Sequence, residues 1–333
     1  MGVNSIDGTV LVTGGAGYIG SHTVRSLREA GREVVVLDSL ELGRREAVID
    51  APLVIGDIHD RDLVATTCNE HGVTQLVHFA AYKAVGESME TPAKYWRNNV
   101  AGSVDLVEAC LASGVNDVVF SSSCSVNGTP DVVPVTENAP IHPESVYAES
   151  KAMVERILFW YGQTSDLRSV SLRYFNAAGA SFDGRIGEDW THSQNLVPLA
   201  MKALLLNERR LTVFGDDYDT PDGTCIRDYI HVADLANAHV KALDYLGRDG
   251  DTVAVNVGTG VGSSVLEVLN TTADVAGEAV PYDVGPRRAG DPVATFADPT
   301  FASDTLGWTA NWGLREIVET AYTWYVSQVE RAR

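Results

Sequence analysis

The sequence of 333 residues predicts an α/β protein with a doubly wound, mostly parallel sheet and a smaller α/β region after it. Two observations predict this class. Apolar runs typical of strands alternate through the first half with helical stretches of about ten residues or more, as in βαβ units. The strand runs are apolar throughout instead of alternating between apolar and polar residues. Such runs are typical of a parallel sheet that is covered by helices on both faces.

The expected elements follow from these patterns in chain order. Buried strands are expected at residues 9–13, 33–37, 53–55, 75–79, 117–120 and 169–175. Helices are expected between them, at residues 18–30, 60–71, 92–113 and 146–163. Periodicity then becomes weaker, and the remaining expected elements are helices at 196–206, 232–246, 264–276 and 314–326, a strand at 253–257, and loops at 215–225 and 281–300.

The composition and periodicity of the sequence change after Asn176, and this change divides the chain into two expected domains. Residues 177–195 are rich in Gly, Asp and Ser and show little periodicity. We therefore expect residues 1–176 to carry the main sheet and residues 177–333 to form a smaller domain, in keeping with about 100–200 residues per domain. The segment 232–257 is a candidate to return to the main sheet.

Composition and charge exclude several classes of function. Apolar residues make up 45% and charged residues 21%, which excludes disorder, collagen repeats and coiled coil as the main architecture. The 25 basic and 45 acidic residues give a net charge of −20, which disfavours nucleic acid and anionic membranes as partners. Lys is scarce among the basic residues, and both a salt-adapted surface and a high-GC genome remain open as explanations.

The sequence predicts a cytoplasmic protein. The four cysteines form no CxxC pair, and a chain of this length needs no disulfide bonds for its stability. The N-terminal residues lack the basic region and apolar core of a signal peptide. No apolar run approaches the roughly 18 residues of a membrane span. No cluster of His, Cys and Asp has the spacing of a metal site.

A glycine-rich segment lies between the first expected strand and the first expected helix. Gly14, Gly17 and Gly20 have the spacing GxxGxxG. Such glycines allow a tight turn, a close approach of the backbone to a pyrophosphate, and close packing of helix on strand. Asp38 ends the second expected strand, near the spacing at which a carboxylate holds a ribose 2′-OH. The segment predicts a Rossmann-type dinucleotide site that prefers NAD to NADP.

Two further residues follow the third expected strand. Asp57 is a candidate to hold the adenine amino group, with Ile58 against the ring. Taken alone, Asp57 is equally well explained as an ordinary acid in a loop.

A Tyr-x-x-x-Lys unit predicts acid–base chemistry. Tyr147 and Lys151 lie within the helix expected at 146–163, and their spacing places both on one face. A phenol has an ordinary pKa near 10, which a nearby ammonium and a cationic nicotinamide would lower. Such a tyrosine can remove a hydroxyl proton while hydride leaves the same carbon. Ser121–Ser123 follow the strand expected at 117–120, at the sheet edge where ligands bind in open α/β folds.

These motifs together resemble the extended short-chain dehydrogenase/reductases, and among them the UDP-glucose 4-epimerase family. The resemblance covers most of the chain. It rests on the segments GGAGYIGSH (14–22), HFAAYKAVGES (78–88), NNV (98–100), FSSS (120–123), RYFN (173–176), DDYDTPDGTCIRDYIHV (216–232) and PRRAGD (286–291).

The resemblance implies an NAD-dependent 4-epimerase of UDP-hexoses. Tyr147 would be the base, Lys151 would lower its pKa, and Ser123 would aid proton transfer at C4 of the sugar, which passes through a 4-keto intermediate. The residues implied to bind the cofactor are Gly14, Gly17, Tyr18, Ile19, Gly20, Asp38, Asp57, Ile58, Phe79, Ala80, Lys83, Asn98, Tyr147, Lys151 and Tyr174. Those implied to bind the UDP-sugar are Lys83, Ser123, Tyr147, Asn176, Asn195, Leu196, Phe214, Arg227, Arg288, Asp291 and Thr295.

The chain departs from the family pattern at several pocket positions. Asn127 replaces the usual Tyr before a Gly, and Tyr82 replaces a smaller or aliphatic residue. Thr295 stands where some members have a bulky Tyr that excludes N-acetylated sugars. The small Thr predicts activity on UDP-GlcNAc and UDP-GalNAc as well.

Other activities are weighed against this one. A 4,6-dehydratase needs an acid pair beside its catalytic hydroxyl, and Ser123–Ser125 contain no acid. A non-catalytic NAD-binding regulator is disfavoured because Tyr147 and Lys151 are both present. A UDP-uronate 4-epimerase or decarboxylase of the same family remains open. In the family the helices corresponding to 94–113 and 146–163 form a dimer interface, which implies a homodimer.

Overall fold

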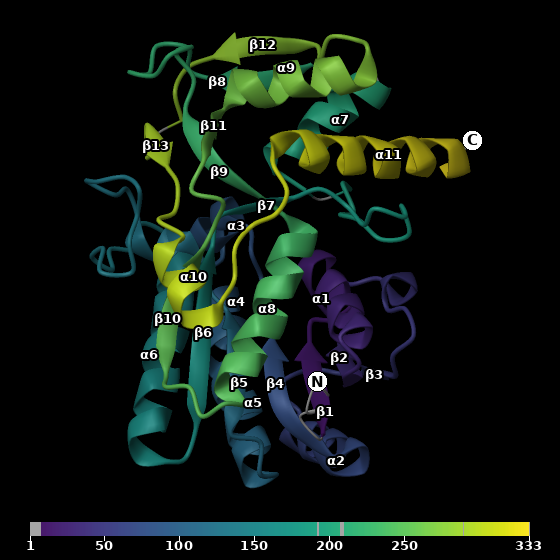
Figure 1. The fold of residues 1–333 in the computed structure, drawn as a ribbon, viewed down its shortest axis with the longest axis vertical. Coiled ribbons are helices and arrows are strands. Elements are labelled where there is room, and N and C mark those ends of the chain that lie inside the picture. The colour runs from purple at the N-terminus through teal and green to yellow at the C-terminus, as the bar shows by residue number, and fades with distance from the viewer. Residues whose placement is uncertain (1–7, 192, 207–209, 289, 333) are drawn as a thin grey trace.

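The centre of the molecule is a seven-stranded parallel sheet. A computed structural model describes residues 8–191, 193–206, 210–288 and 290–332. All neighbouring strands of the sheet pair in parallel, which confirms the predicted fold class (Figure 1). In spatial order the strands are β10 (Val253–Val257), β6 (Arg168–Tyr174), β5 (Asp117–Ser121), β4 (Val73–His78), β1 (Thr9–Thr13), β2 (Glu33–Asp38) and β3 (Leu53–Ile55).

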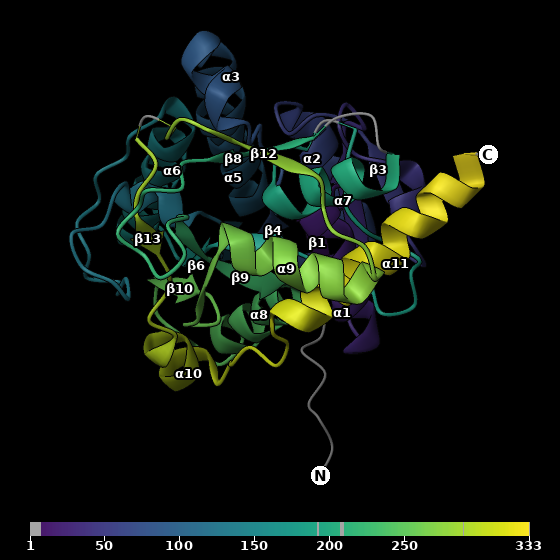
Figure 2. The same cartoon turned by 90° about the horizontal axis from the view of Figure 1, so that it is seen from above.

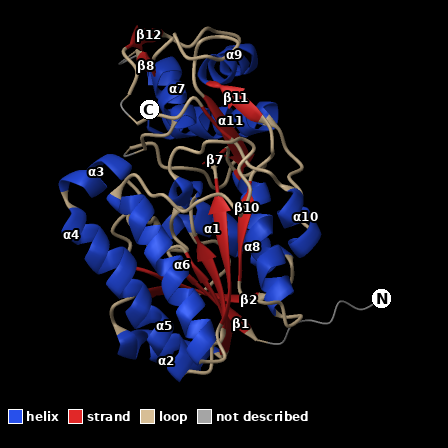
Figure 3. Ribbon diagram, turned by 90° about the vertical axis from the view of Figure 1, so that its left-hand side faces the viewer, coloured by secondary structure: helices blue, strands red, loops and turns tan. Residues whose placement is uncertain are grey.

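Helices cover both faces of this sheet, as the apolar strands predict (Figure 3). Alternate residues of a strand point to opposite faces. Val10 and Val12 belong to one apolar core, whereas Leu11 between them belongs to the other. The first core contains residues of α1 (Tyr18–Glu29), α8 (Val232–Leu246) and α10 (Thr300–Leu306). The second contains residues of α2 (Arg61–His71), α5 (Gly102–Ala112) and α6 (Val146–Thr164).

The long helix expected at 92–113 is helical over nearly that length but is not a uniform α-helix. It consists of α4 (Pro92–Tyr95), a π-helical segment over Trp96–Ala101, and α5. A short helix, α3 (Val85–Glu90), precedes it and was not expected. A π-helical segment rotates the side chains on its two sides relative to a regular helix, and such segments are frequent at functional sites.

A smaller group of elements lies above the sheet in Figure 1. Strand β9 (Ile226–His231) pairs with β7 (Asn176–Ala178), β11 (Gly262–Ser264) and β13 (Ala294–Thr295). Strand β8 (Leu211–Phe214) pairs with β12 (Tyr282–Gly285). Three helices complete the group, and α11 packs against the other two (Figure 2). They are α7 (Leu196–Leu206), α9 (Val265–Ala276) and α11 (Leu314–Ala332).

The chain returns to the main sheet after residue 232. Strand β10 pairs with β6, and α8 packs against α1. Helix α10, later in the chain, also packs against α8 and β10. Trp308 just beyond it is buried, and its indole N–H donates a bond of 3.1 Å to the carbonyl of Asp234. None of the helices in the described part of the chain is both long and apolar enough to cross a lipid bilayer.

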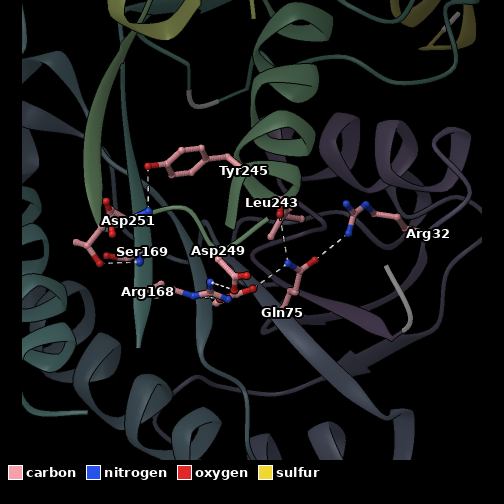
Figure 4. A network of polar contacts seen from close by, with 10 residues as sticks. Arg32, Gln75, Arg168, Ser169, Leu243, Tyr245, Asp249 and Asp251 are labelled. Atoms are coloured by element: carbon pink, nitrogen blue, oxygen red, sulfur yellow. Dashed lines mark hydrogen bonds and ion pairs between the residues drawn. The ribbon is translucent and has the colours of Figure 1, made fainter. Parts of the chain in front are cut away.

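A polar network joins neighbouring elements at the amino ends of the strands (Figure 4). Gln75 Oε1 accepts a hydrogen bond of 2.8 Å from Arg32, and Gln75 Nε2 donates to Asp117 and to the carbonyl of Leu243, each at 3.3 Å. Asp117 in turn accepts two bonds from Arg168, at 3.1 and 2.8 Å. The network thus ties β4, β5, β6 and α8 together at this end of the sheet.

Candidate active site

A pocket opens at the opposite end of the sheet, where the parallel strands have their carboxyl ends. Its walls are the loops after β1, β2, β3 and β4, the ends of β5 and β6, the start of α6, and part of the segment 188–193. Every residue that the sequence assigns to the cofactor lines it: Gly14, Gly17, Tyr18, Ile19, Gly20, Asp38, Asp57, Ile58, Phe79, Ala80, Lys83, Asn98, Tyr147, Lys151 and Tyr174.

The glycine loop between β1 and α1 has no room for side chains at two positions. A Cβ on Gly14 would lie 2.7 Å from the backbone nitrogen of Ala80, and the residue has a φ of +73°. A Cβ on Gly20 would lie 2.3 Å from the carbonyl oxygen of Gly14. Helix α1 follows directly, and no side chain caps its first turn. A helix start of this kind presents backbone N–H groups and a positive dipole end to an anion.

Asp38 connects the glycine loop to the loop after β2. Its Oδ2 accepts a bond of 2.9 Å from the N–H of Ala16, and its Oδ1 accepts one of 2.8 Å from the N–H of Leu40. The carboxylate is therefore held in a fixed place at the pocket wall. Asp57 is exposed at the same wall and Ile58 beside it is buried.

Tyr147 and Lys151 lie in the first turns of α6. Ser145 is the N-cap of this helix, and its side chain accepts a hydrogen bond from the N–H of Ala148. Both side chains are buried, with 9% and 3% of their surface exposed. Lys151 Nζ donates a bond of 2.7 Å to the carbonyl of Ser121 and lies 5.9 Å from the centre of the Tyr147 ring. The helical spacing thus brings the phenol and the ammonium to the same side of the pocket.

Burial displaces the pKa values of these groups. Burial lowers the pKa of Lys151 to about 7. Burial also raises the pKa of Tyr147, and the Tyr174 hydroxyl acts in the same direction, whereas a hydrogen bond with Ser123 acts against it. In the chain alone, burial therefore outweighs any effect of the Lys151 ammonium on Tyr147. A further positive charge in the pocket would favour the phenolate form.

The residues expected to bind the UDP-sugar lie mostly outside this pocket. Arg227 donates a bond of 2.8 Å to Asp291, and the Arg288 guanidinium lies 4.4 Å from the centre of the Phe214 ring. Thr295 is paired with Arg227 in the register of β13 and β9. These five residues form a group in the upper part of the molecule.

The other expected substrate residues lie nearer the pocket. Lys83 and Tyr147 line it, and Ser123 is buried and acts to lower the pKa of Tyr147. Asn176 begins β7, and Leu196 begins α7 directly after Asn195.

Glu188 is a pocket residue that the sequence did not reveal. Its side chain is only 5% exposed, and one oxygen, Oε1, accepts bonds from Ser193 at 2.9 Å, Asn195 at 3.1 Å and Lys83 at 3.4 Å. It therefore joins two expected substrate residues from distant parts of the chain. An acid in a segment without periodicity carries no sequence signal for such a role.

Several other lining residues were also missed. Most lie beside expected ones, so closeness in sequence to a motif was the available signal. They are Leu37, Ser39, Glu41, Leu42, Gly43, Gly56, Ala81, Asp189 and Ser193.

A glycine loop before a helix, an acid at the end of β2, and a Tyr–Lys pair on α6 meet in one pocket. This combination defines a dinucleotide-binding protein of the short-chain dehydrogenase/reductase type. The chain belongs to the NAD dependent epimerase/dehydratase family, whose model matches residues 10–258.

Comparison with individual proteins points to one group in this family. The chain is 48% identical over 317 residues to a UDP-glucose 4-epimerase of Azospirillum brasilense, covering 95% of this chain and 91% of the relative. It is 44% identical to that of Halalkalibacterium halodurans, over 95% of each chain.

Two solved structures have the same fold over nearly the whole chain. UDP-glucose 4-epimerase from Brucella ovis in complex with NAD superposes with a TM-score of 0.94 at 44% identity, covering 96% of this chain and 98% of that one. The enzyme from Stenotrophomonas maltophila, with bound NAD and formylated UDP-arabinopyranose, gives a TM-score of 0.95 at 39% identity, covering 98% and 100%.

Proposed function

We propose that this chain is a UDP-glucose 4-epimerase, which interconverts UDP-glucose and UDP-galactose with NAD as a bound cofactor. The observation that carries the proposal is the position of Tyr147 and Lys151, buried in the same pocket as the glycine loop. The names of the relatives support the same activity. A UDP-uronate 4-epimerase or decarboxylase is not favoured by them.

The pocket fits NAD. Gly14 and Gly20 let the backbone of this loop pack closely against Ala80 and against the start of α1. The uncapped first turn of α1 then offers backbone N–H groups that suit a pyrophosphate. Asp38 is fixed where a ribose hydroxyl needs an acceptor, and an acid there disfavours a 2′-phosphate. Bound NAD would supply a reversible two-electron acceptor and a positive charge near Tyr147.

Tyr147 would move the proton of the sugar 4-hydroxyl. Its pKa is raised by burial, and positive charge in the site would favour the phenolate. Lys151, which is buried and held by the carbonyl of Ser121, would supply part of that charge when protonated. Ser123, which acts to lower the pKa of Tyr147, would help to pass the proton. After the 4-keto sugar has turned over, C4 would regain its hydrogen on the opposite face while Tyr147 returns a proton to the same oxygen, which would complete the inversion at C4.

The UDP group would be held by the upper part of the molecule. Arg227 and Arg288 are suited to phosphate because a guanidinium offers a planar fork of donors. Phe214, against Arg288, offers an aromatic face beside it. Glu188 would keep Asn195 and Lys83 in place. Asn176, which begins β7, and Leu196, which begins α7, would complete the contacts with the UDP-sugar.

Thr295 supports a broader substrate range. The residue is 8% exposed, and its hydroxyl oxygen lacks a hydrogen-bond partner among the described residues. Thr occupies less volume than Tyr, which would leave more space for an acetamido group at this position. UDP-GlcNAc and UDP-GalNAc would then also be substrates.

A second copy of the chain is the proposed partner. Helix α6 exposes three large apolar side chains, Met153, Phe159 and Trp160, with 37%, 48% and 59% of their surface accessible. Exposed apolar patches of this kind mark interfaces. Light scattering on the purified protein should give twice the mass of the chain, and a monomer at micromolar concentration would refute the dimer.

Turnover of UDP-galactose and UDP-GalNAc, measured side by side at low and high salt, tests the proposed function. Conversion of both supports the epimerase and the role of Thr295. Conversion of UDP-galactose alone keeps the epimerase and refutes the broader range. Failure with both substrates, despite bound NAD, would refute the proposed activity.

A further inference from the structure

A hydrogen bond crosses between two walls of the cofactor pocket. Tyr82 Oη donates to Glu41 Oε2 at 2.6 Å. Glu41 lies in the loop after β2, and Tyr82 lies in the loop after β4, and both residues line the pocket. Tyr82 is also one of the positions at which this sequence departs from the family pattern. The bond therefore joins two segments between which a bound dinucleotide would lie.

Tyr82 is held in place on its own side of the pocket. The side chain of Asn99 accepts from the N–H of Tyr82 at 2.9 Å and donates to its carbonyl at 3.0 Å. The ammonium of Lys94 lies 3.8 Å from the centre of the Tyr82 ring, and the Tyr95 ring is packed at 5.9 Å. Asn99 belongs to the π-helical segment, and this segment therefore holds the loop that carries Tyr82 in position.

The opposite wall is fixed by Asp38. Leu40 has a φ of +59°, which is uncommon for a residue with a side chain, and its N–H is bonded to Asp38. Gly43 packs closely there, since a Cβ on it would lie 2.7 Å from Asp38 Oδ1. Leu42 between them lines the pocket with 62% of its surface exposed. The loop thus holds Glu41 and an exposed apolar side chain at the pocket edge.

The adenosine side is the part of the pocket that this bond spans. Asp38 and Asp57 are the residues assigned to the ribose and the adenine, and both lie on the wall that carries Glu41. Asp57 is close enough to Tyr82 to contribute to the raised pKa of its phenol, after burial and the bond with Glu41. That pKa is about 12, so Tyr82 remains a proton donor at neutral pH.

We propose that Glu41 and Tyr82 form a clasp over the adenosine side of the pocket and slow the release of NAD. The clasp rests on the cofactor assigned under the proposed function. Release requires the two loops to separate, so the bond adds to the barrier for dissociation. A hydrogen bond to a charged group that is partly exposed predicts an effect of about three- to tenfold on the release rate. Glu41 and Tyr82 act as positioning residues, not as catalytic residues.

The test is the rate at which the purified holoenzyme releases NAD. The variants are Tyr82→Phe, which removes only the hydroxyl, Glu41→Ala, and the two combined. Excess alcohol dehydrogenase with ethanol converts released NAD to NADH, whose absorbance reports the release. We expect each single variant to release NAD about three- to tenfold faster. The double variant should be no faster than the faster single variant, because both remove the same bond.

Tyr161→Phe is the matched control. Tyr161 donates a bond of 2.7 Å to Glu108, between α6 and α5 and outside the pocket lining. This variant should release NAD at the wild-type rate. The thermal unfolding midpoint of the cofactor-free Tyr82→Phe protein should match that of the wild type. If the Tyr82 hydroxyl only stabilised the fold, this midpoint would fall.

Three outcomes would overturn the clasp. Release from Tyr82→Phe at the wild-type rate, or equal acceleration in Tyr161→Phe, would refute it while leaving the epimerase intact. A wild-type protein that binds no NAD would refute the clasp together with the assigned cofactor. Faster release in a protein that binds NAD but does not epimerise UDP-sugars would support the clasp and refute the proposed function.

Discussion

The two ends of the central sheet use buried polar groups in different ways. At the amino ends of the strands, Gln75, Asp117 and Arg168 bond to one another and fasten neighbouring strands. At the carboxyl ends, Tyr147 and Lys151 are buried beside a pocket, and burial displaces the pKa of each from its ordinary value. One end gains stability from polar groups that satisfy each other. The other end buries ionisable groups whose pKa values are displaced, and such groups are typical of sites that bind or convert a ligand.

The largest expected effect is a loss of turnover at the carboxyl end without a loss of NAD binding. Tyr147→Phe removes the hydroxyl that would take the sugar proton and keeps the ring. Turnover of UDP-galactose should fall by about 10²- to 10⁴-fold, the usual contribution of a general base. The content of bound NAD and the unfolding midpoint should stay near those of the wild type. Turnover within a few-fold of the wild type would exclude Tyr147 as the base.

The next prediction concerns the amino end. Asp117→Ala removes, at a buried position, the acceptor of Arg168 Nε and Nη2 and one of the two acceptors of Gln75 Nε2. The free energy of unfolding in urea should fall by about 2–4 kcal/mol, while turnover per folded molecule is kept.

Asp249→Ala is the control for the amino end. Asp249 accepts from the same Arg168 at 2.8 Å, but its side chain is 97% exposed. Its removal should cost less than about 1 kcal/mol, because exposed ion pairs contribute little. Equal losses of unfolding free energy in Asp117→Ala and Asp249→Ala would contradict the distinction between a buried hydrogen-bond network and an exposed ion pair.

A third prediction uses the pH dependence of stability at the carboxyl end. The pKa of Lys151 is lowered from its ordinary 10.5 to about 7 in the folded protein. Between these values the unfolded chain binds more protons at this residue, so its contribution to stability rises with pH. Lys151→Met should reduce the rise in unfolding free energy from about pH 7 to pH 10 by about 1–3 kcal/mol.

Urea unfolding of cofactor-free wild type and Lys151→Met at several pH values measures this difference. Parallel curves for the two proteins would show that the ammonium is not destabilised by burial. A smaller rise in the wild type than in the variant would show a displacement of the opposite sign.

The smallest predicted effect tests the substrate range. Thr295→Tyr places a bulky ring where the sequence predicts room for an acetamido group. The kcat/KM for UDP-GalNAc should fall about tenfold relative to that for UDP-galactose, which corresponds to about 1.4 kcal/mol. Thr295→Ser keeps the hydroxyl and should keep the ratio. A ratio unchanged by the tyrosine would refute the role of Thr295.

The sequence predicted the parts of the molecule that depend on local spacing. The glycine loop, Asp38 and the Tyr147–Lys151 pair each follow from a pattern within one strand–helix unit, and the structure brings them to one pocket. His78 ends an apolar run, a pattern that favours a core histidine over a ligand, and its buried ring bonds to Thr13 at 2.8 Å and to Ser103 at 2.9 Å.

The features that were missed depend on contacts between distant segments. Strands β7, β11 and β13 have two or three residues each, too few for any periodicity to appear. The bond between Glu41 and Tyr82, and the position of Glu188, depend on how separate loops meet. The π-helical segment within the helix at 92–112 has the same composition as a regular helix, so its residues gave no signal.

The proposed mechanism makes one central claim about the carboxyl end: Tyr147 would remove only the hydroxyl proton, and the hydrogen on C4 would leave and return without exchange with solvent. Conversion of UDP-galactose by the purified protein in deuterated water tests it most directly, with the product analysed by NMR. The account predicts UDP-glucose with the original hydrogen at C4. Deuterium at C4, or an absence of conversion by protein with bound NAD, would contradict it.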